Sequence, residues 1–401
     1  MKHFFVEPVE SLMFGQPRSF AAGEAHRSVS LFPPSPYAFQ GLVRSRLLHA
    51  TRGPLDFEAA GARERIETLV GSPDALKPDW QITGPYPALR RQIEEGTTVL
   101  EPWLPVPRFL VRGRAREILW ARPVADVQGG LSDLGEMLLF GRPEAGPCKA
   151  LTGWLSAAAL KAALTSGRSR SPLEWTHDSW RPGLPPFVEQ ELRPGLAITP
   201  GGAAARHGLL YFLEALRFAP DGGFWARFAP ELSDDFETSA LETGMASFGR
   251  KGRLVRFGGV AEVDPAWRSL LAGEHLPQEI SETELCWLVA LSPLRLDDPR
   301  ELVLRTPLPD GVKLEVRTAL TGPPLTLGGF SLARGTARPN RVYVPAGSAW
   351  AVGLVGGTPH TRAQALRTLH DSHPFGPPEE AAMGFGHILA GRGPSGTGDE
   401  T

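Results

Sequence analysis

The chain has 401 residues, of which 42% are hydrophobic, so it is long enough and apolar enough to form the cores of two or three domains. Its formal net charge of −2 excludes a uniformly basic protein, and any contact with nucleic acid must come from local clusters of cations. Six of its 42 cationic side chains are lysines and the rest are arginines, whose guanidinium groups can bind phosphates in a bidentate manner and stack on bases. A GC-rich genome gives the same bias, and both explanations stay open.

Cys148 and Cys286 are too few for a disulfide framework or a thiolate metal site, and we expect no metal and no other cofactor. The N-terminus lacks the basic and then apolar pattern of a signal peptide, and no apolar run reaches the ~20 residues of a membrane span. These features predict a cytoplasmic protein with no membrane partner.

The first predicted elements are a strand over residues 4–14, a loop through Ser30 and a helix. Ser35 is a good N-cap, Pro36 suits the first helical position, and apolar residues recur every four positions at Phe39, Val43 and Leu47. Gln40 and Arg44 share another face of this helix. Gly41 in its interior indicates a close neighbour, either a ligand or the protein's own sheet.

Residues 57–70 and 151–164 are predicted helices, whereas the prolines of residues 101–107 predict broken structure in an insertion that wraps the first domain. Strands are predicted over residues 189–198, 209–218 and 224–228. The connection 199–208 is rich in small residues, which is typical of a ribbon tip that contacts a partner or is mobile.

The last third contains predicted strands at 284–291, 301–305, 313–320 and 341–355, a helix from Thr361 to His370, and a glycine-rich turn from Gly384 to Gly391. Glycine lets another backbone approach closely. A proline-fixed helix start near one end of the chain and this turn near the other predict a cradle for a polyanion, provided that Ser35 and Gly386 converge in space.

Enzyme signatures are incomplete. Gly329–Ala333 approaches a nucleophile elbow but ends in alanine, and Gly386–Gly391 is followed by Arg392 and Gly393 where a phosphate loop would have lysine and serine or threonine. His370 and His373 have metal-ligand spacing without a clear third ligand, so we interpret them as a polar helix end. His26 and His387 could act as general acids or bases, or could contact RNA.

Clustered arginines beside glycines and aromatic residues give a stronger signal. Arg250, Lys251 and Arg253 form one cluster, and a second contains Arg334, Arg338 and Arg341. Such clusters suit phosphate contact combined with base stacking, and each is also compatible with a solvated face.

A family resemblance spans nearly the whole chain. It is carried, in one order, by Phe5–Pro8, Phe14–Phe20, Ala22–Glu24, Ser30–Ser45, Trp103–Val111, Trp154–Leu155, Glu191–Leu196, Gly208–Tyr211, Gly249–Arg253, Ser292–Pro293, Val344–Ser348 and Gly384–Gly391. These segments resemble the Cas5-like RAMP subunits of type III-B CRISPR effectors, the third subunit of the Cmr complex.

The resemblance implies an α+β fold with two ferredoxin-like (RRM-like) RAMP halves, inserted proline-rich segments and a protruding β-hairpin thumb. The expected domains are an N-terminal half at 1–188, a thumb region at 189–262, a C-terminal half at 263–390 and a disordered tail at 391–401. It also implies a non-catalytic subunit that holds the 5′ handle of the crRNA. The implied partners are the guide–target duplex, the large polymerase-like subunit and the backbone RAMP subunits.

The RNA-binding residues expected by this reasoning are Arg18, His26, Ser35, Gln40, Arg44, Arg46, Arg193, Arg250, Lys251, Arg253, Gly384, Gly386, His387, Gly391 and Arg392. At the glycine-rich turn the backbone N–H groups are expected to make the contact. The chain departs from the family at Gly15–Arg18, where relatives often carry an acidic and a basic residue, and after Gly391, where an aromatic residue is common. Two alternatives stay open, which are an endoribonuclease of the same superfamily that uses His26 or His387, and a pure protein scaffold.

Overall fold

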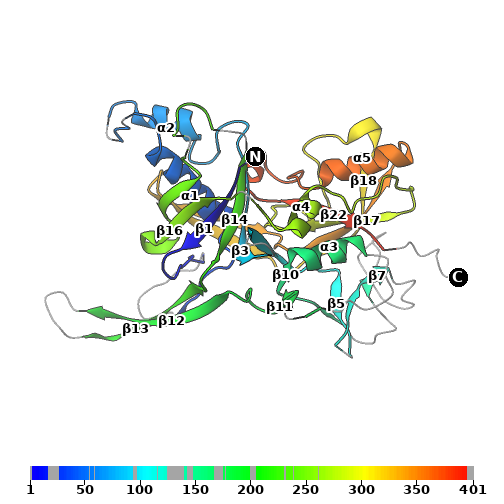
Figure 1. The fold of residues 1–401 in the computed structure, drawn as a ribbon, viewed down its shortest axis with the longest axis horizontal. Helices are drawn as coiled ribbons and strands as arrows, with labels where there is room; N and C mark the ends of the chain where they lie inside the picture. Colours follow the sequence, from blue (N-terminus) through cyan, green and yellow to red (C-terminus); the bar gives the residue numbers. More distant parts are fainter. Residues whose placement is uncertain are drawn as a thin grey trace. The chain divides into compact units, whose positions relative to one another are not determined.

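The computed structural model describes residues 2–16, 27–53, 55–57, 59–93, 97–114, 116–123, 140–141, 148–166, 175–176, 178–198, 205–229, 232–237, 239–260 and 262–394. Several antiparallel sheets and a few short helices make up these residues, so the predicted α+β class is confirmed (Figure 1). Arg18, His26, the ribbon tip 199–204 and the tail from residue 395 lie outside the described residues.

The chain divides into two compact units, each assembled from three separate segments. Unit 1 contains residues 1–100, 186–262 and 326–342, and unit 2 contains residues 101–185, 263–325 and 343–401. The segments of the two units alternate along the chain, whereas the sequence boundaries at 188, 262 and 390 divide it into consecutive stretches. Those boundaries stay a prediction.

An antiparallel sheet forms the centre of unit 1. Five consecutive strands of this sheet follow the order β3 (Gln81–Gln92), β14 (Gly222–Ala229), β1 (Lys2–Pro8), β16 (Leu254–Gly259) and β15 (Thr243–Ser247). Helix α1 (Pro36–His49) packs against this sheet through Phe39, whose ring stacks on Phe4 at a centroid distance of 5.9 Å. Phe4 in turn stacks on Phe257 at 4.9 Å. The helix starts where the sequence predicts, because Ser35 accepts a hydrogen bond from the Ala38 amide and Pro36 occupies the first turn.

Three further elements complete unit 1. Helix α2 (Ala62–Val70) contacts α1, and strands β19 (Leu325–Ser331) and β20 (Thr336–Tyr343) form a two-stranded sheet to which unit 1 contributes residues 326–342. Strands β12 (Val188–Ile198) and β13 (Ala205–Phe218) form a long antiparallel ribbon that extends away from the sheet (green in Figure 1). The short strand β2 (Arg27–Ser28) pairs with β13 in parallel.

Unit 2 is built around a four-stranded sheet. Its order is β18 (Lys313–Leu320), β21 (Ala349–Val355), β17 (Leu285–Ala290) and β22 (Ile388–Arg392). Apolar side chains of this sheet and of helix α5 (Pro359–Leu369), including Leu288, Trp350 and Leu366, form one buried core.

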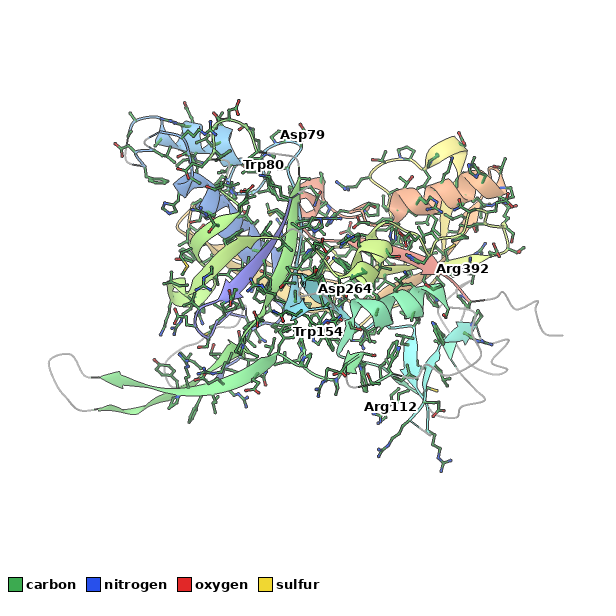
Figure 2. The ribbon with its side chains drawn as sticks, viewed as in Figure 1. Asp79, Trp80, Arg112, Trp154, Asp264 and Arg392 are labelled. Carbon is green, nitrogen blue, oxygen red and sulfur yellow. The ribbon has the colours of Figure 1, made fainter. Side chains whose placement is uncertain are left out.

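Among the described residues of unit 2, the other α-helices are α3 (Ala157–Thr165), α4 (Pro265–Leu271) and α6 (Pro378–Ala382). Asp264, labelled in Figure 2, caps α4 by accepting hydrogen bonds from the Ala266 and Trp267 amides. The remaining strands are β4 (Thr98–Pro105), β5 (Leu110–Arg112), β6 (Ile118–Trp120), β7 (Arg122–Pro123), β8 (Phe140–Gly141), β9 (Lys149–Ala150), β10 (Trp154–Ser156) and β11 (Trp180–Arg181). Among them β10 pairs with both β11 and the Trp103–Pro105 part of β4.

Several secondary-structure predictions were wrong. The strand predicted over residues 4–14 ends at Pro8, and the strand predicted over residues 341–355 is interrupted between β20, which ends at Tyr343, and β21, which begins at Ala349. Residues 101–105 belong to β4 rather than to broken structure, because a proline is tolerated in a strand wherever its nitrogen faces no partner carbonyl. Residues 301–305 form no strand and make only an isolated bridge at Leu304. Gly391 and Arg392, expected in the disordered tail, pair with Trp287 and Cys286 in the last strand.

Among the described residues, no helix is both long enough and apolar enough to cross a bilayer.

Candidate nucleic-acid interface

A basic turn at the edge of unit 1 carries three of the predicted RNA-binding residues, Arg250, Lys251 and Arg253. Backbone hydrogen bonds hold the turn at both ends, because the Phe248 amide donates to the Arg253 carbonyl at 2.7 Å and the Arg250 amide donates to the Met13 carbonyl at 2.8 Å. Lys251 is exposed and has a φ of 62°, which directs the chain sharply at the tip. The turn therefore presents Arg250 and Lys251 from a fixed backbone, whereas the Arg253 side chain forms an ion pair with Glu10.

The basic turn lies beside the segment Met13–Gln16, which leads into the predicted first loop with Arg18 and His26. The Arg250 side chain packs so closely on Gly15 that a Cβ there would be 3.2 Å from Arg250 Cδ. Gly15 also forms a bridge with Ser30, on the other flank of the same loop. Both flanks of the loop are thus fixed next to the turn, although Arg18 and His26 themselves lie outside the described residues.

The second flank leads directly into α1. Ser30 Oγ accepts a hydrogen bond from the Phe14 amide at 2.9 Å, and the Leu31 amide donates to the Phe14 carbonyl at 2.8 Å. Ser35 follows as the N-cap of α1. The structure consequently brings together the basic turn, the two ends of the first loop and the start of the helix, all within unit 1.

The ribbon carries Arg193, which pairs with Glu191 at 3.1 Å, and Arg217 from β13 approaches the same carboxylate at 2.8 Å. The hydrogen bond from Arg193, assisted by Arg217, lowers the pKa of the Glu191 carboxyl. Two guanidinium groups thus share the Glu191 carboxylate, and Glu189 lies opposite Arg217 on the neighbouring strand.

A buried carboxylate ties the ribbon to the first loop. Glu214 on β13 is only 2% exposed and accepts hydrogen bonds from Arg27 at 2.7 Å and from Gln190 at 2.6 Å. Arg27 belongs to β2, the strand that follows the loop. Because a buried carboxylate needs its partners, this network fixes β2 against both strands of the ribbon.

On α1, Gln40 and Arg44 face the turn that follows α2. Arg44 donates to the Gly71 carbonyl at 2.6 Å and to Gln40 Oε1 at 3.3 Å, and Gln40 is buried. Burial, together with the nearby charge of Arg338, lowers the pKa of Arg44 to about 10. Arg44 is therefore charged at neutral pH, and its guanidinium is hydrogen-bonded to other groups of unit 1.

Arginines of the second cluster also interact with other residues of unit 1. Arg334 pairs with Asp74, and Arg338 donates to the Pro73 carbonyl at 3.0 Å. Arg46, on another face of α1, donates to the Thr243 carbonyl of β15 at 2.7 Å. These guanidinium groups connect elements of unit 1, and RNA contact by Arg44 or Arg46 stays a prediction.

The glycine-rich turn lies in unit 2 and is buried. The Gly384 amide donates to the Ala381 carbonyl at 3.0 Å and the Gly386 amide to the Pro293 carbonyl at 2.9 Å, so the amides expected to bind phosphate are used within the protein. Gly391 packs on α3, and the exposed Arg392 lies at the end of β22 (Figure 2). RNA contact at these positions stays a prediction, as does the convergence of Ser35 in unit 1 with Gly386 in unit 2.

His387 is fully buried rather than displayed on a loop. Its Nε2 lies 2.9 Å from Asp371 Oδ1, and its ring stacks on His373 at a centroid distance of 5.1 Å. His373 Nδ1 lies 2.7 Å from the Phe385 carbonyl, to which it can donate. The histidines thus connect the end of α5 with the glycine-rich turn, and His387 is placed to stabilise that turn.

Sequence reasoning missed the partners that hold these residues. Tyr37 and Asp74 contact Arg338, and Glu214 contacts Arg27, although each pair is far apart in the chain. No local pattern marks such partners, because each is an ordinary polar residue until the fold brings it to its arginine.

Comparison with known proteins identifies the family. A profile described as CRISPR-associated protein (Cas_Cmr3) matches residues 4–393. No curated protein sequence matches. A chain in the cryo-EM structure of the Type III-B Cmr-beta bound to cognate target RNA and AMPPnP matches at a TM-score of 0.44 and 15% identity, over 87% of this chain and 86% of the other. A chain in the crystal structure of a Csm1–Csm4 cassette in complex with cA4 matches at a TM-score of 0.30 and 14% identity, with 89% of each chain covered.

The family match extends from the first strand of unit 1 to the last strand of unit 2. It covers the segments on which the resemblance was inferred from the sequence, and the chain belongs to the Cas_Cmr3 family of CRISPR-associated proteins.

Proposed function

We propose that this chain is a non-catalytic RNA-binding subunit of a type III-B CRISPR effector complex that holds the 5′ handle of the crRNA. The observation that carries the proposal is the basic turn Arg250–Arg253, whose backbone is fixed beside both flanks of the loop that contains Arg18 and His26. Fixed cations next to a helix start can hold the phosphates of a single strand while loop side chains accept its bases.

The remaining roles are part of the same proposal and rest on analogy with the family that the chain matches. The two units would be ferredoxin-like halves, and the ribbon β12–β13 would act as the thumb at the guide–target duplex. Its paired arginines, Arg193 and Arg217, suit a backbone of phosphates. The large polymerase-like subunit and the backbone RAMP subunits would be its protein partners, and the complex would act in the cytoplasm.

The absence of catalysis is part of the proposal. His387, one of two candidate acids or bases, is fully buried and faces Asp371, which favours a structural role over proton transfer to an RNA hydroxyl. The endoribonuclease alternative then depends on His26. Incubation of the purified protein with repeat RNA tests it, since a unique cut that His26→Ala abolishes would establish cleavage and overturn the non-catalytic assignment.

The binding proposal is tested in the reconstituted complex with a crRNA that carries photoactivatable uridines in its 5′ handle. We expect adducts on this chain within unit 1, at the basic turn or the first loop. A crRNA with the probes moved to its 3′ end is the matched control and should give no adduct there. Handle adducts found only on other subunits would reject the proposal and support a pure scaffold.

A further inference from the structure

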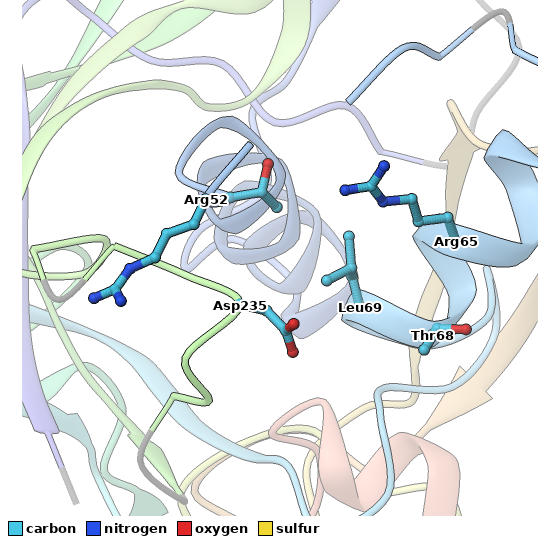
Figure 3. Close-up of a pocket in the computed structure, with 6 residues that line it drawn as sticks. Arg52, Arg65, Thr68, Leu69 and Asp235 are labelled. Carbon is cyan, nitrogen blue, oxygen red and sulfur yellow. The ribbon is translucent and has the colours of Figure 1, made fainter. Parts of the chain in front are cut away.

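Unit 1 contains a small pocket that is lined by none of the residues assigned above. It has a volume of about 220 Å³ and is lined by Thr51, Arg52, Arg65, Thr68, Leu69 and Asp235. Figure 3 shows that its walls come from three elements, with Arg65 reaching in from α2, Arg52 on the segment that follows α1, and Asp235 on the loop after β14.

Two of these walls are hydrogen-bonded to each other. The Arg52 amide donates to the Asp235 carbonyl at 2.8 Å, and the Glu237 amide donates to the Ala50 carbonyl at 2.8 Å. Thr51 forms a bridge with Phe236 between these bonds. The third wall, α2, is anchored by Leu69, which is 8% exposed. The pocket is therefore shaped by the backbone before any ligand arrives.

The pocket offers a defined set of donors and acceptors. Thr51 and Thr68 use their hydroxyl protons on the Leu48 carbonyl at 3.2 Å and the Glu64 carbonyl at 2.9 Å, so towards a ligand both hydroxyl oxygens are acceptors. Asp235 is a further acceptor, with one carboxylate oxygen already bonded to Ser233 at 2.8 Å. Arg65 forms no ion pair with the described residues, and its five N–H groups are donors only.

This combination selects the ligand. Guanidinium groups bind phosphate in a bidentate manner, whereas a carboxylate repels phosphate and requires hydroxyl or amino donors. A ligand that satisfies both kinds of group carries a phosphate next to free hydroxyls. A volume of about 220 Å³ is below the ~300–1,000 Å³ of sites that enclose drug-sized ligands, which limits the buried part to a sugar phosphate.

We propose that this pocket binds the phosphorylated ribose of a nucleotide. Arg65 holds the phosphate, Asp235 and the threonine oxygens accept from the ribose hydroxyls, Leu69 contacts the sugar carbons, and the base lies outside. The same chemistry is presented by a free nucleotide and by one nucleotide of an RNA chain.

The experiment measures binding of three probes to the full chain by calorimetry, namely ribose 5-phosphate, AMP and a short single-stranded oligoribonucleotide. Arg65→Gln should weaken binding of ribose 5-phosphate and AMP by at least about tenfold, the loss expected for a charge-assisted contact. Arg63→Gln is the matched control, because Arg63 lies on the same helix but pairs with Glu67 at 3.0 Å outside the pocket. Its affinities should equal those of the unmodified chain.

The oligonucleotide distinguishes the two sources. If Arg65→Gln weakens AMP binding alone, the pocket takes free nucleotides, and if it weakens both, the pocket contacts RNA. Asp235→Ala should remove the preference for ribose 5-phosphate over inorganic phosphate. The proposal is overturned if neither ribose 5-phosphate nor AMP binds, or if Arg65→Gln and Arg63→Gln bind equally well.

Discussion

The guanidinium of Arg338 lies over the ring of Tyr37, with its Cζ atom 4.9 Å from the ring centroid. The same group donates to the Pro73 carbonyl at 3.0 Å and lies 3.7 Å from Asp74. One side chain on β20 thereby joins the β19–β20 hairpin to α1 and to the turn after α2. Because its side chain is only 14% exposed, these contacts are poorly screened by solvent.

Replacing Arg338 should loosen the hairpin. We expect Arg338→Ala to lower the free energy of unfolding by about 1–2 kcal/mol, because it removes the cation–π interaction and one hydrogen bond. Hydrogen–deuterium exchange should rise over β19 and β20. Asn340→Ala, an exposed position of the same strand, is the control. Equal exchange in the two variants would show that Arg338 does not fasten the hairpin.

The basic turn should determine how RNA affinity responds to salt. Arg250→Gln and Lys251→Gln should each reduce the log–log slope of handle-RNA affinity against salt by up to ~0.7, because a variant that binds one phosphate fewer releases fewer counterions from a single strand. Fluorescence anisotropy over a salt series provides the slope. Lys313→Gln, an exposed lysine of unit 2, should leave it unchanged. Identical slopes for all three variants would remove the turn from the RNA interface.

Gly391 should tolerate no side chain. A Cβ there would lie 2.9 Å from the Leu164 carbonyl oxygen and 2.7 Å from Leu164 Cδ2, so β22 or α3 would have to move. Gly391→Ala should therefore lower the free energy of unfolding by about 1–3 kcal/mol, the usual cost of overpacking. Urea titration gives the value. Gly258→Ala is the control, since a Cβ at that strand position meets nothing within 4 Å. A Gly391→Ala variant as stable as Gly258→Ala would contradict this packing.

His370 should make unit 2 sensitive to acid. Burial, followed by repulsion from His275, lowers the pKa of His370 to about 4 from an ordinary value of 6.5. Its Nδ1 accepts from the Ala390 amide at 3.1 Å while Nε2 lies 2.7 Å from the Leu270 carbonyl, so a proton added at Nδ1 would face an N–H group. The folded state therefore resists protonation of this ring.

Because the folded pKa is depressed, the stability from the neutral ring is fully present above pH 6.5 and is lost as the pH falls towards 4. The loss should be on the order of 3 kcal/mol, and His370→Asn should reduce it, since its amide can replace only part of the ring's bonding. Thermal unfolding across this range measures the effect. His360→Gln, an exposed position on α5, should behave as the unmodified chain. An unchanged pH dependence in His370→Asn would assign the acid sensitivity to other groups.

Local signals were sufficient for much of the fold. Ser35 and Pro36 marked the start of α1, and the ribbon strands and α5 lie close to their predicted ranges, because caps and hydrophobic periodicity act over a few residues. The hairpin β19–β20 went unpredicted, since Gly328, Gly329 and Pro339 are weak strand formers whose pairing depends on the partner strand.

The candidate site was predictable in composition but not in arrangement. The sequence marks Arg250–Arg253 as basic, yet only the fold places that turn beside Gly15 and Ser30. The sequence also indicates that another backbone can approach Gly384 and Gly386 closely. It does not show that the amides of these glycines already donate hydrogen bonds to carbonyls of unit 2. Whether a polar group faces a ligand or its own chain is decided by interactions between residues far apart in sequence.

The carboxylate of Glu214 has a mechanical consequence. Separating it from Arg27 would leave a negative charge in a site that is 2% exposed, with Gln190 as its remaining hydrogen-bond donor. A buried carboxylate resists such a loss of its cationic partner. A force applied at Arg27 is therefore transmitted to both Glu214 and Gln190. The part of the β12–β13 ribbon around Glu214 should move together with β2 as one rigid piece.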